Sequence, residues 1–137
     1  MTTAGALKET VCQSIDQNRD RIIGVGEAIM DDPELGFKEH RTAEKVQEVF
    51  NDLGLEFDSG LGLTGVKAVL RGGQPGPTVA LMGELDALQV PGPPRANPDT
   101  QAAHACGHNA QIAGLMGAAV GLHASGMAKE LAGNIVF

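Results

Sequence analysis

The sequence has no tryptophan and no tyrosine, and only four of its 137 residues are phenylalanine. A hydrophobic core must therefore be built mainly from aliphatic side chains. Cations are also scarce, because 10 Lys and Arg stand against 17 Asp and Glu, which gives a formal net charge of −7. A chain with this balance lacks the clustered cations that a phosphate backbone attracts. We therefore expect no nucleic-acid partner.

Disulfide, secretion and membrane signals are missing as well. The two cysteines, Cys12 and Cys106, are too few for a disulfide framework. The N-terminus does not show the charged-then-apolar layout of a signal peptide. The longest apolar stretch, 112–122, is interrupted by three glycines and is too short to span a bilayer. These absences predict a cytoplasmic protein with reduced thiols and no membrane contact.

Apolar residues make up 42% of the chain and charged residues 20%, which is typical of a globular protein. Helical periodicity is found over residues 6–30, 40–53 and 108–124. The first helix should end before Pro33, which restricts the residue before it and cannot continue the ladder. Gly54 is a natural left-handed cap for the second helix. Cys12, beside an apolar position of the first helix, is expected in the core.

Extended segments are predicted over 55–57, 66–70, 78–82 and 135–137, and loops over 71–77 and 91–98. The uninterrupted apolar run at 78–82 is typical of a strand that is buried on both faces. The order of elements predicts an α/β fold with a mixed, partly parallel sheet flanked by helices. Because the sequence ends within the last predicted strand, we expect it to be the front portion of a longer protein.

Two motifs carry candidate chemistry, and the first is GELDAL at 83–88, directly after the apolar run. Glu84 and Asp86 are two residues apart, so in an extended segment both point to the same side. The carboxyl end of a strand is the usual ligand position in open α/β sheets. Two acids there can bind a metal, orient a ligand or transfer protons. Alternatively, both side chains are simply solvated.

The second motif, HACGHN at 104–109, concentrates His104, Cys106 and His108 immediately before a predicted helix. Thiolate and imidazole are good ligands for zinc and related cations, and Gly107 permits a sharp turn between them. Two other interpretations remain open. Cys106 can be a nucleophile with a histidine as its base, or the three side chains can be a small buried thiol and turn residues.

These motifs and PELGFKEHRTA at 33–43 occur in order along the whole chain. Together they resemble the opening third of the metal-dependent amidohydrolases related to hippurate hydrolase, auxin-conjugate hydrolases and aminobenzoyl-glutamate hydrolase, within the aminoacylase and carboxypeptidase group. The resemblance implies that 1–137 is the front part of a zinc-peptidase-like catalytic domain, with its remainder and a lid or dimerisation domain outside this sequence. It also implies a homodimer of the full-length protein.

The implied activity is hydrolysis of the amide bond in N-acyl amino acids, short peptides or related small conjugates. The implied cofactor is one or two divalent cations, zinc or manganese, with cobalt or nickel as alternatives. By matching position, Cys106 and His108 are metal ligands, and His104 is a further candidate ligand. Asp86 orients a ligand or the metal site, and Glu84 stands where another acid is usual, so these two acids are the catalytic candidates.

The sequence departs from this group in two ways. Asn109 stands where Asp is frequent, which removes one charge beside the metal. The general-base glutamate and the later ligands of the group have no counterpart in these 137 residues. We therefore expect the 137 residues alone to be catalytically inactive. The alternative function is a non-catalytic metal-binding or interaction module derived from the same fold.

Overall fold

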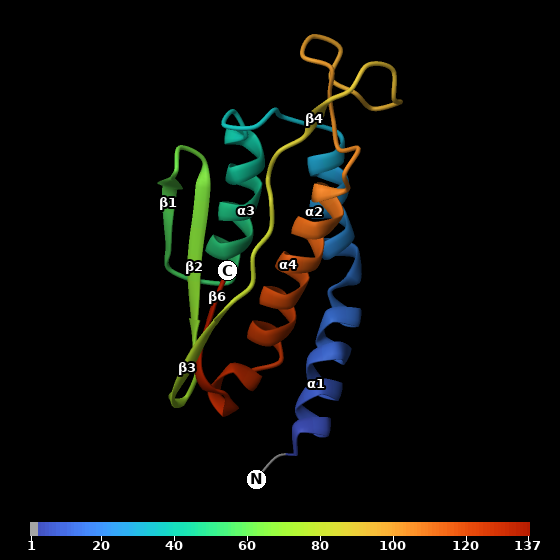
Figure 1. The fold of residues 1–137 in the computed structure, drawn as a ribbon. Coiled ribbons are helices and arrows are strands. Elements are labelled where there is room, and N and C mark those ends of the chain that lie inside the picture. Colours follow the sequence, from blue (N-terminus) through green and yellow to red (C-terminus); the bar gives the residue numbers. More distant parts are fainter. Residues whose placement is uncertain (1–2) are drawn as a thin grey trace.

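The computed structural model describes residues 3–137, which form four α-helices, one 3₁₀ helix and six strands (Figure 1). The helices are α1 (Ala4–Gln17), α2 (Arg19–Met30), α3 (His40–Asp52), α4 (His108–Ala124) and the 3₁₀ helix η1 (Met127–Glu130). The strands are β1 (Phe57–Leu61), β2 (Gly65–Arg71), β3 (Gln74–Ala80), β4 (Leu88–Gln89), β5 (Ala102–Ala103) and β6 (Ala132–Val136).

The helix predicted over 6–30 is two helices, and Asn18 separates them. Its side-chain amide donates to the Ser14 carbonyl at 2.8 Å, and its backbone N–H donates to the carbonyls of Ser14 and Ile15. The Asn18 carbonyl in turn accepts the Ile22 N–H at 3.0 Å, which begins α2. An asparagine side chain can form hydrogen bonds with nearby backbone groups and so compete with the hydrogen bonds of a continuous helix. A single Asn18 therefore separates two helices within one helical pattern of apolar residues.

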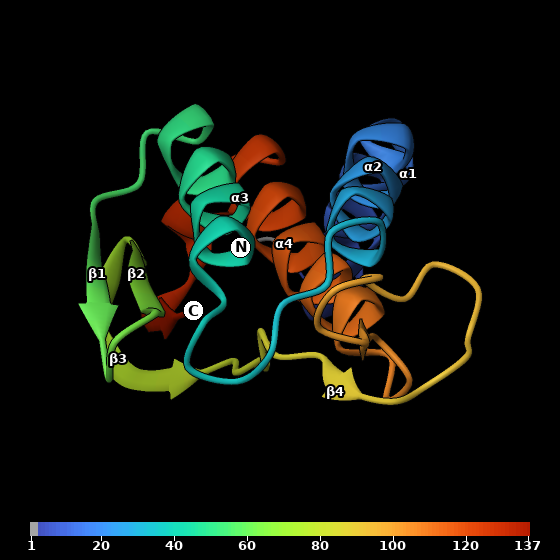
Figure 2. The ribbon, with the colours of Figure 1, turned by 90° about the horizontal axis from the view of Figure 1, so that it is seen from above.

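Helix α4 lies between α3 on one side and α1 with α2 on the other (Figures 1 and 2). Small residues allow the close approach of α2 and α4, since a Cβ at Gly26 would come within 3.0 Å of the Ala113 Cβ. The predicted bounds of α4 are confirmed, and α3 ends one residue earlier than predicted. Both helices begin or end at residues with strong local signals, which explains the agreement.

The main sheet has the order β1-β2-β6-β3, with β2 antiparallel to β1 and β6, and β3 parallel to β6. The predicted α/β fold with a mixed sheet is therefore confirmed. Its core is mostly aliphatic, as expected, but Phe50 lies at its centre and is 1% exposed. The Phe50 ring contacts those of Phe57 and Phe137, with centroids 6.1 and 6.3 Å away.

The prediction that 78–82 is buried on both faces is wrong. Strand β3 begins earlier, at Gln74 within the predicted loop, and every one of its residues is exposed. It pairs with β6 alone at the edge of the main sheet, and Val79 is 55% exposed. An apolar run indicates that a strand has side chains suited to burial. It does not show whether another strand or helix covers those side chains.

Three smaller expectations also need correction. Of the strand predicted over 55–57, only Phe57 belongs to a strand, as the first residue of β1. Strand β6 starts at Ala132, before the predicted 135–137. Cys12 is exposed on α1 and does not belong to the core. Within residues 3–137, no helix combines the length and the apolar character that crossing a membrane requires.

Candidate active site

The candidate residues meet where two chain segments pass each other. The segment 81–87 follows β3 and leads to β4, and the short loop 104–107 leads from β5 into α4. Figure 2 shows the first of these segments running past the N-terminal end of α4. Gly107 precedes α4 in the left-handed conformation, with φ of 77°, so the turn requires the glycine. This turn places His108 at the first position of the helix.

His108 lies between the two acids of the GELDAL motif. Its Nε2 is 3.1 Å from Glu84 Oε2, and its Nδ1 is 3.0 Å from Asp86 Oδ1. Nδ1 also lies 2.8 Å from the carbonyl oxygen of Asp86. The structure thus brings together three predicted site residues, and both acids contact one histidine. They contact opposite ring nitrogens, however, and so do not share one ligand position.

The Asp86 contacts determine which nitrogen of His108 carries hydrogen. A ring nitrogen that faces a carbonyl oxygen must donate, so Nδ1 is assigned as N–H. In the neutral ring, the Nε2 lone pair then points toward the Glu84 carboxylate. A cation between this lone pair and the carboxylate, which are 3.1 Å apart, would be held by both acceptors. Two ligands that are each about 2.0–2.2 Å from one Zn²⁺ can lie about 3 Å apart, so this pair fits a metal ion.

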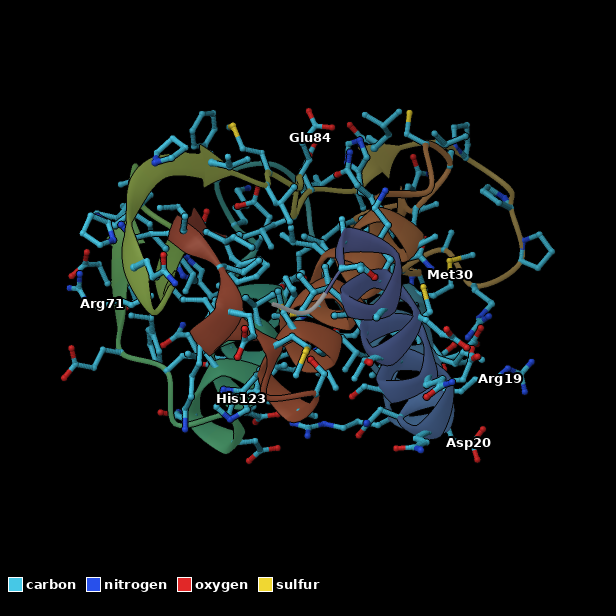
Figure 3. All side chains as sticks on the ribbon, turned by 90° about the horizontal axis from the view of Figure 1, so that it is seen from below. Arg19, Asp20, Met30, Arg71, Glu84 and His123 are labelled. Carbon is cyan, nitrogen blue, oxygen red and sulfur yellow. The ribbon has the colours of Figure 1, made fainter. Side chains whose placement is uncertain are left out.

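Exposure differs among these side chains. His108 is 16% exposed and Asp86 33%, whereas Glu84 is 65% exposed. Figure 3 shows Glu84 projecting outward from the segment after β3. The backbone N–H of Glu84 donates to Gln111 Oε1 at 2.6 Å, which ties this segment to α4. The backbone is held in place while the carboxylate stays open to a ligand.

His104 is buried, with 6% exposure, and neither ring nitrogen has a hydrogen-bond partner. Burial lowers the pKa of His104, and the nearby His108 adds to this effect while Asp86 opposes it. A buried imidazole without a partner is uncommon in proteins and calls for an explanation. A neutral His104 retains one free donor and one free acceptor close to the site.

Cys106 is exposed in the loop before α4. Within residues 3–137, no three His, Cys, Asp or Glu side chains converge in a way that could hold a metal ion. The assignments of Cys106, His108 and His104 as ligands therefore stay predictions.

Two buried acids near the site were not singled out from the sequence. The Glu34 carboxylate, 6% exposed, accepts the Thr42 N–H at 2.8 Å and caps α3 from across the loop. Glu39, also 6% exposed, accepts from the Thr64 hydroxyl at 2.8 Å. Glu39 borders the same cavity as Glu84. Both acids belong to the PELGFKEHRTA block at 33–43. Their place in that block was the one sequence feature that could have marked them as candidate site residues.

Comparisons with known proteins identify relatives of this chain. Thermostable carboxypeptidase 2 of Saccharolobus solfataricus is 37% identical over 121 residues, covering 82% of this chain and 30% of its own length. The N-acyl-L-amino acid amidohydrolase of Geobacillus stearothermophilus is 33% identical over 115 residues, with 82% and 31% coverage. No protein-family model matches the sequence.

The fold is also found in a solved structure from Bacillus subtilis, described as a dinuclear metal-binding peptidase of the M20 family. The TM-score is 0.78 at 29% identity, and the match covers 89% of this chain and 35% of that chain. This chain thus spans about a third of the length of the relatives it matches. The shared part is their N-terminal part.

Proposed function

Because the chain is homologous to the N-terminal part of M20-family amidohydrolases and peptidases, we propose that it is the front part of the catalytic domain of such a hydrolase. The whole protein would hydrolyse the amide bond of N-acyl amino acids or related small conjugates. The observation that carries the proposal is the contact of His108 with Glu84 and Asp86 at the start of α4.

The residues have different proposed roles. Asp86 holds the Nδ1–H of His108 and so presents Nε2 as a ligand, the usual arrangement of a metal-binding histidine. His108 and Cys106 would hold the metal, with Glu84 within reach of Nε2 and His104 as a further candidate. A bound divalent cation of this kind polarises a carbonyl and activates water near neutral pH. Zinc, manganese, cobalt and nickel all suit this mixed donor set.

We also propose that the 137 residues alone do not turn over substrate. A general base must take the proton of the attacking water. Of the four acids described above at or near the site, Glu84 and Asp86 are engaged with His108, and Glu34 and Glu39 are buried. In this proposal residues 1–137 are a partial catalytic domain, and the full-length protein is a cytoplasmic homodimer. Robust metal-dependent amidase activity of the purified 137-residue chain would contradict it.

Cobalt spectroscopy tests the ligand assignment without relying on activity. The native chain loaded with Co²⁺ should show a thiolate-to-cobalt charge-transfer band, because Cys106 supplies sulfur to the ion. Cys106→Ser should remove the band. Cys12→Ser is the matched control, since Cys12 is also exposed but lies on α1, and the band should persist. A band that survives in Cys106→Ser would rule out this ligand.

A further inference from the structure

The segment that carries the two acids is held at both ends by backbone hydrogen bonds. The Leu81 N–H donates to a carbonyl of β6 at 2.8 Å, and the Ala87 N–H donates to a carbonyl in the loop between α2 and α3 at 2.7 Å. The residues between them belong to no helix or strand. Within residues 3–137, the Glu84 N–H is the one backbone donor of this stretch that has a partner, the Gln111 side-chain oxygen at 2.6 Å. A side chain of α4 therefore holds the middle of the segment.

Gly83 allows this segment to approach α4 closely. A Cβ at position 83 would lie 2.8 Å from Ile112 Cδ1 and 3.2 Å from Leu115 Cδ2. A side chain there would have to displace Ile112, which is 2% exposed. The same Cβ would lie 3.7 Å from Gln111 Oε1. The glycine thus brings the backbone onto the helix, and the hydrogen bond of the next residue fixes its position along the helix.

Gln111 links Glu84 to His108 through the helix itself. It follows His108 by three residues on α4, and residues three apart are neighbours on a helix surface. Glu84 Oε2 lies 3.1 Å from His108 Nε2, although the Glu84 side chain is 65% exposed. Among the described residues, His108 is the one polar partner of that carboxylate. The backbone position of Glu84 therefore determines whether its carboxylate reaches Nε2.

We propose that Gln111 is a positioning residue for the pair formed by His108 and Glu84. Its amide oxygen holds the Glu84 backbone where the carboxylate reaches Nε2, so that both side chains can hold one cation. Gln111 supplies no ligand and acts through Glu84. This role depends on the proposed function, because the pair serves catalysis only when it holds a metal ion.

Gln111→Met tests this role, because methionine keeps the length of the side chain and suits a helix but offers no oxygen acceptor. Competition with a chromophoric chelator should show zinc binding about tenfold weaker than in the native chain, the lower end of the usual effect of groups that orient metal ligands. Gln17→Met is the matched control, since Gln17 is an exposed glutamine of α1. It should bind zinc like the native chain.

A double-mutant cycle separates positioning of Glu84 from general support of the helix. In a Glu84→Ala chain, Gln111→Met should change zinc affinity by less than about twofold, because the group through which Gln111 acts is already absent. A loss of the same size with and without the Glu84 carboxylate would overturn the proposal. So would a Gln111→Met chain that binds zinc as the native chain does.

The metal-free chain provides a second readout, measured at one fixed pH. In Gln111→Met, the ¹⁵N chemical shift of His108 Nε2 should move toward its value in Glu84→Ala, and the Glu84 amide should exchange at least about tenfold faster. An unchanged Nε2 shift would overturn the proposal. If the native chain shows no saturable zinc binding, the proposed function fails instead. The Nε2 shift then still decides whether Gln111 positions Glu84.

Discussion

Replacing Asp86 with alanine should weaken metal binding without destroying it. Asp86 holds the His108 ring through two acceptors, its carboxylate at 3.0 Å and its backbone carbonyl at 2.8 Å from Nδ1. The substitution removes the carboxylate and leaves the carbonyl. Nδ1 therefore keeps its hydrogen, and Nε2 remains available as a ligand, but the ring is less firmly oriented and less basic.

The size of the effect follows from these contacts. Loss of a group that orients a metal-binding histidine usually costs about 10–100-fold in affinity. The retained carbonyl and the 33% exposure of the Asp86 side chain both favour the lower end of that range. We expect about a tenfold loss for Asp86→Ala, equivalent to about 1.4 kcal/mol of binding free energy. Removal of the ligand itself in His108→Ala should abolish specific binding.

Competition between the protein and a chromophoric zinc chelator measures these affinities. Asp99→Ala is the charge-matched control, because Asp99 is an exposed acid in the loop between β4 and β5. It should bind zinc like the native chain. If Asp86→Ala binds as the native chain does, or loses all binding as His108→Ala should, the assigned role of Asp86 is wrong.

Three further predictions concern stability. Phe50→Ala should cost about 3–5 kcal/mol in urea unfolding, because the ring is 1% exposed, and a loss below about 1 kcal/mol would contradict the proposed core. Glu34→Ala should cost about 1–3 kcal/mol by leaving the buried Thr42 N–H without an acceptor, measured the same way. The pKa of Asp32 is lowered, mainly by its hydrogen bonds from Arg41. The ionised Asp32 carboxylate therefore stabilises the folded state at pH values above the ordinary Asp pKa of about 3.9. Asp32→Asn should therefore cost about 1 kcal/mol at pH 7, and its difference from the native chain should shrink as the pH falls below about 4; a difference independent of pH would refute this assignment.

Sequence reasoning succeeded where structure is decided locally. The bounds of α4 follow from Gly107 before it and from the small and apolar residues that make up most of the helix. The spacing of Glu84 and Asp86 in an extended segment predicts that both side chains point to the same side, and both contact His108. Each of these features depends on residues within one turn or one strand of each other.

The features that the sequence did not reveal depend on distant partners. The exposure of β3 is set by which strands and helices lie beside it, and its own residues do not encode that. The buried contact of Glu39 with Thr64 joins residues 25 positions apart, so no spacing rule predicts it. That Glu84 and Asp86 meet opposite nitrogens of His108 depends on the ring orientation, which the packing of α4 determines.

The central claim, that His108 anchors a metal site, is tested most directly by equilibrium dialysis against buffered free zinc. His123→Ala is the matched control, because His123 is an exposed histidine on the same helix and lies on the other side of the view from Glu84 in Figure 3. We predict saturable zinc binding by the native chain and by His123→Ala, and none by His108→Ala. Equal zinc uptake by all three proteins would contradict the account.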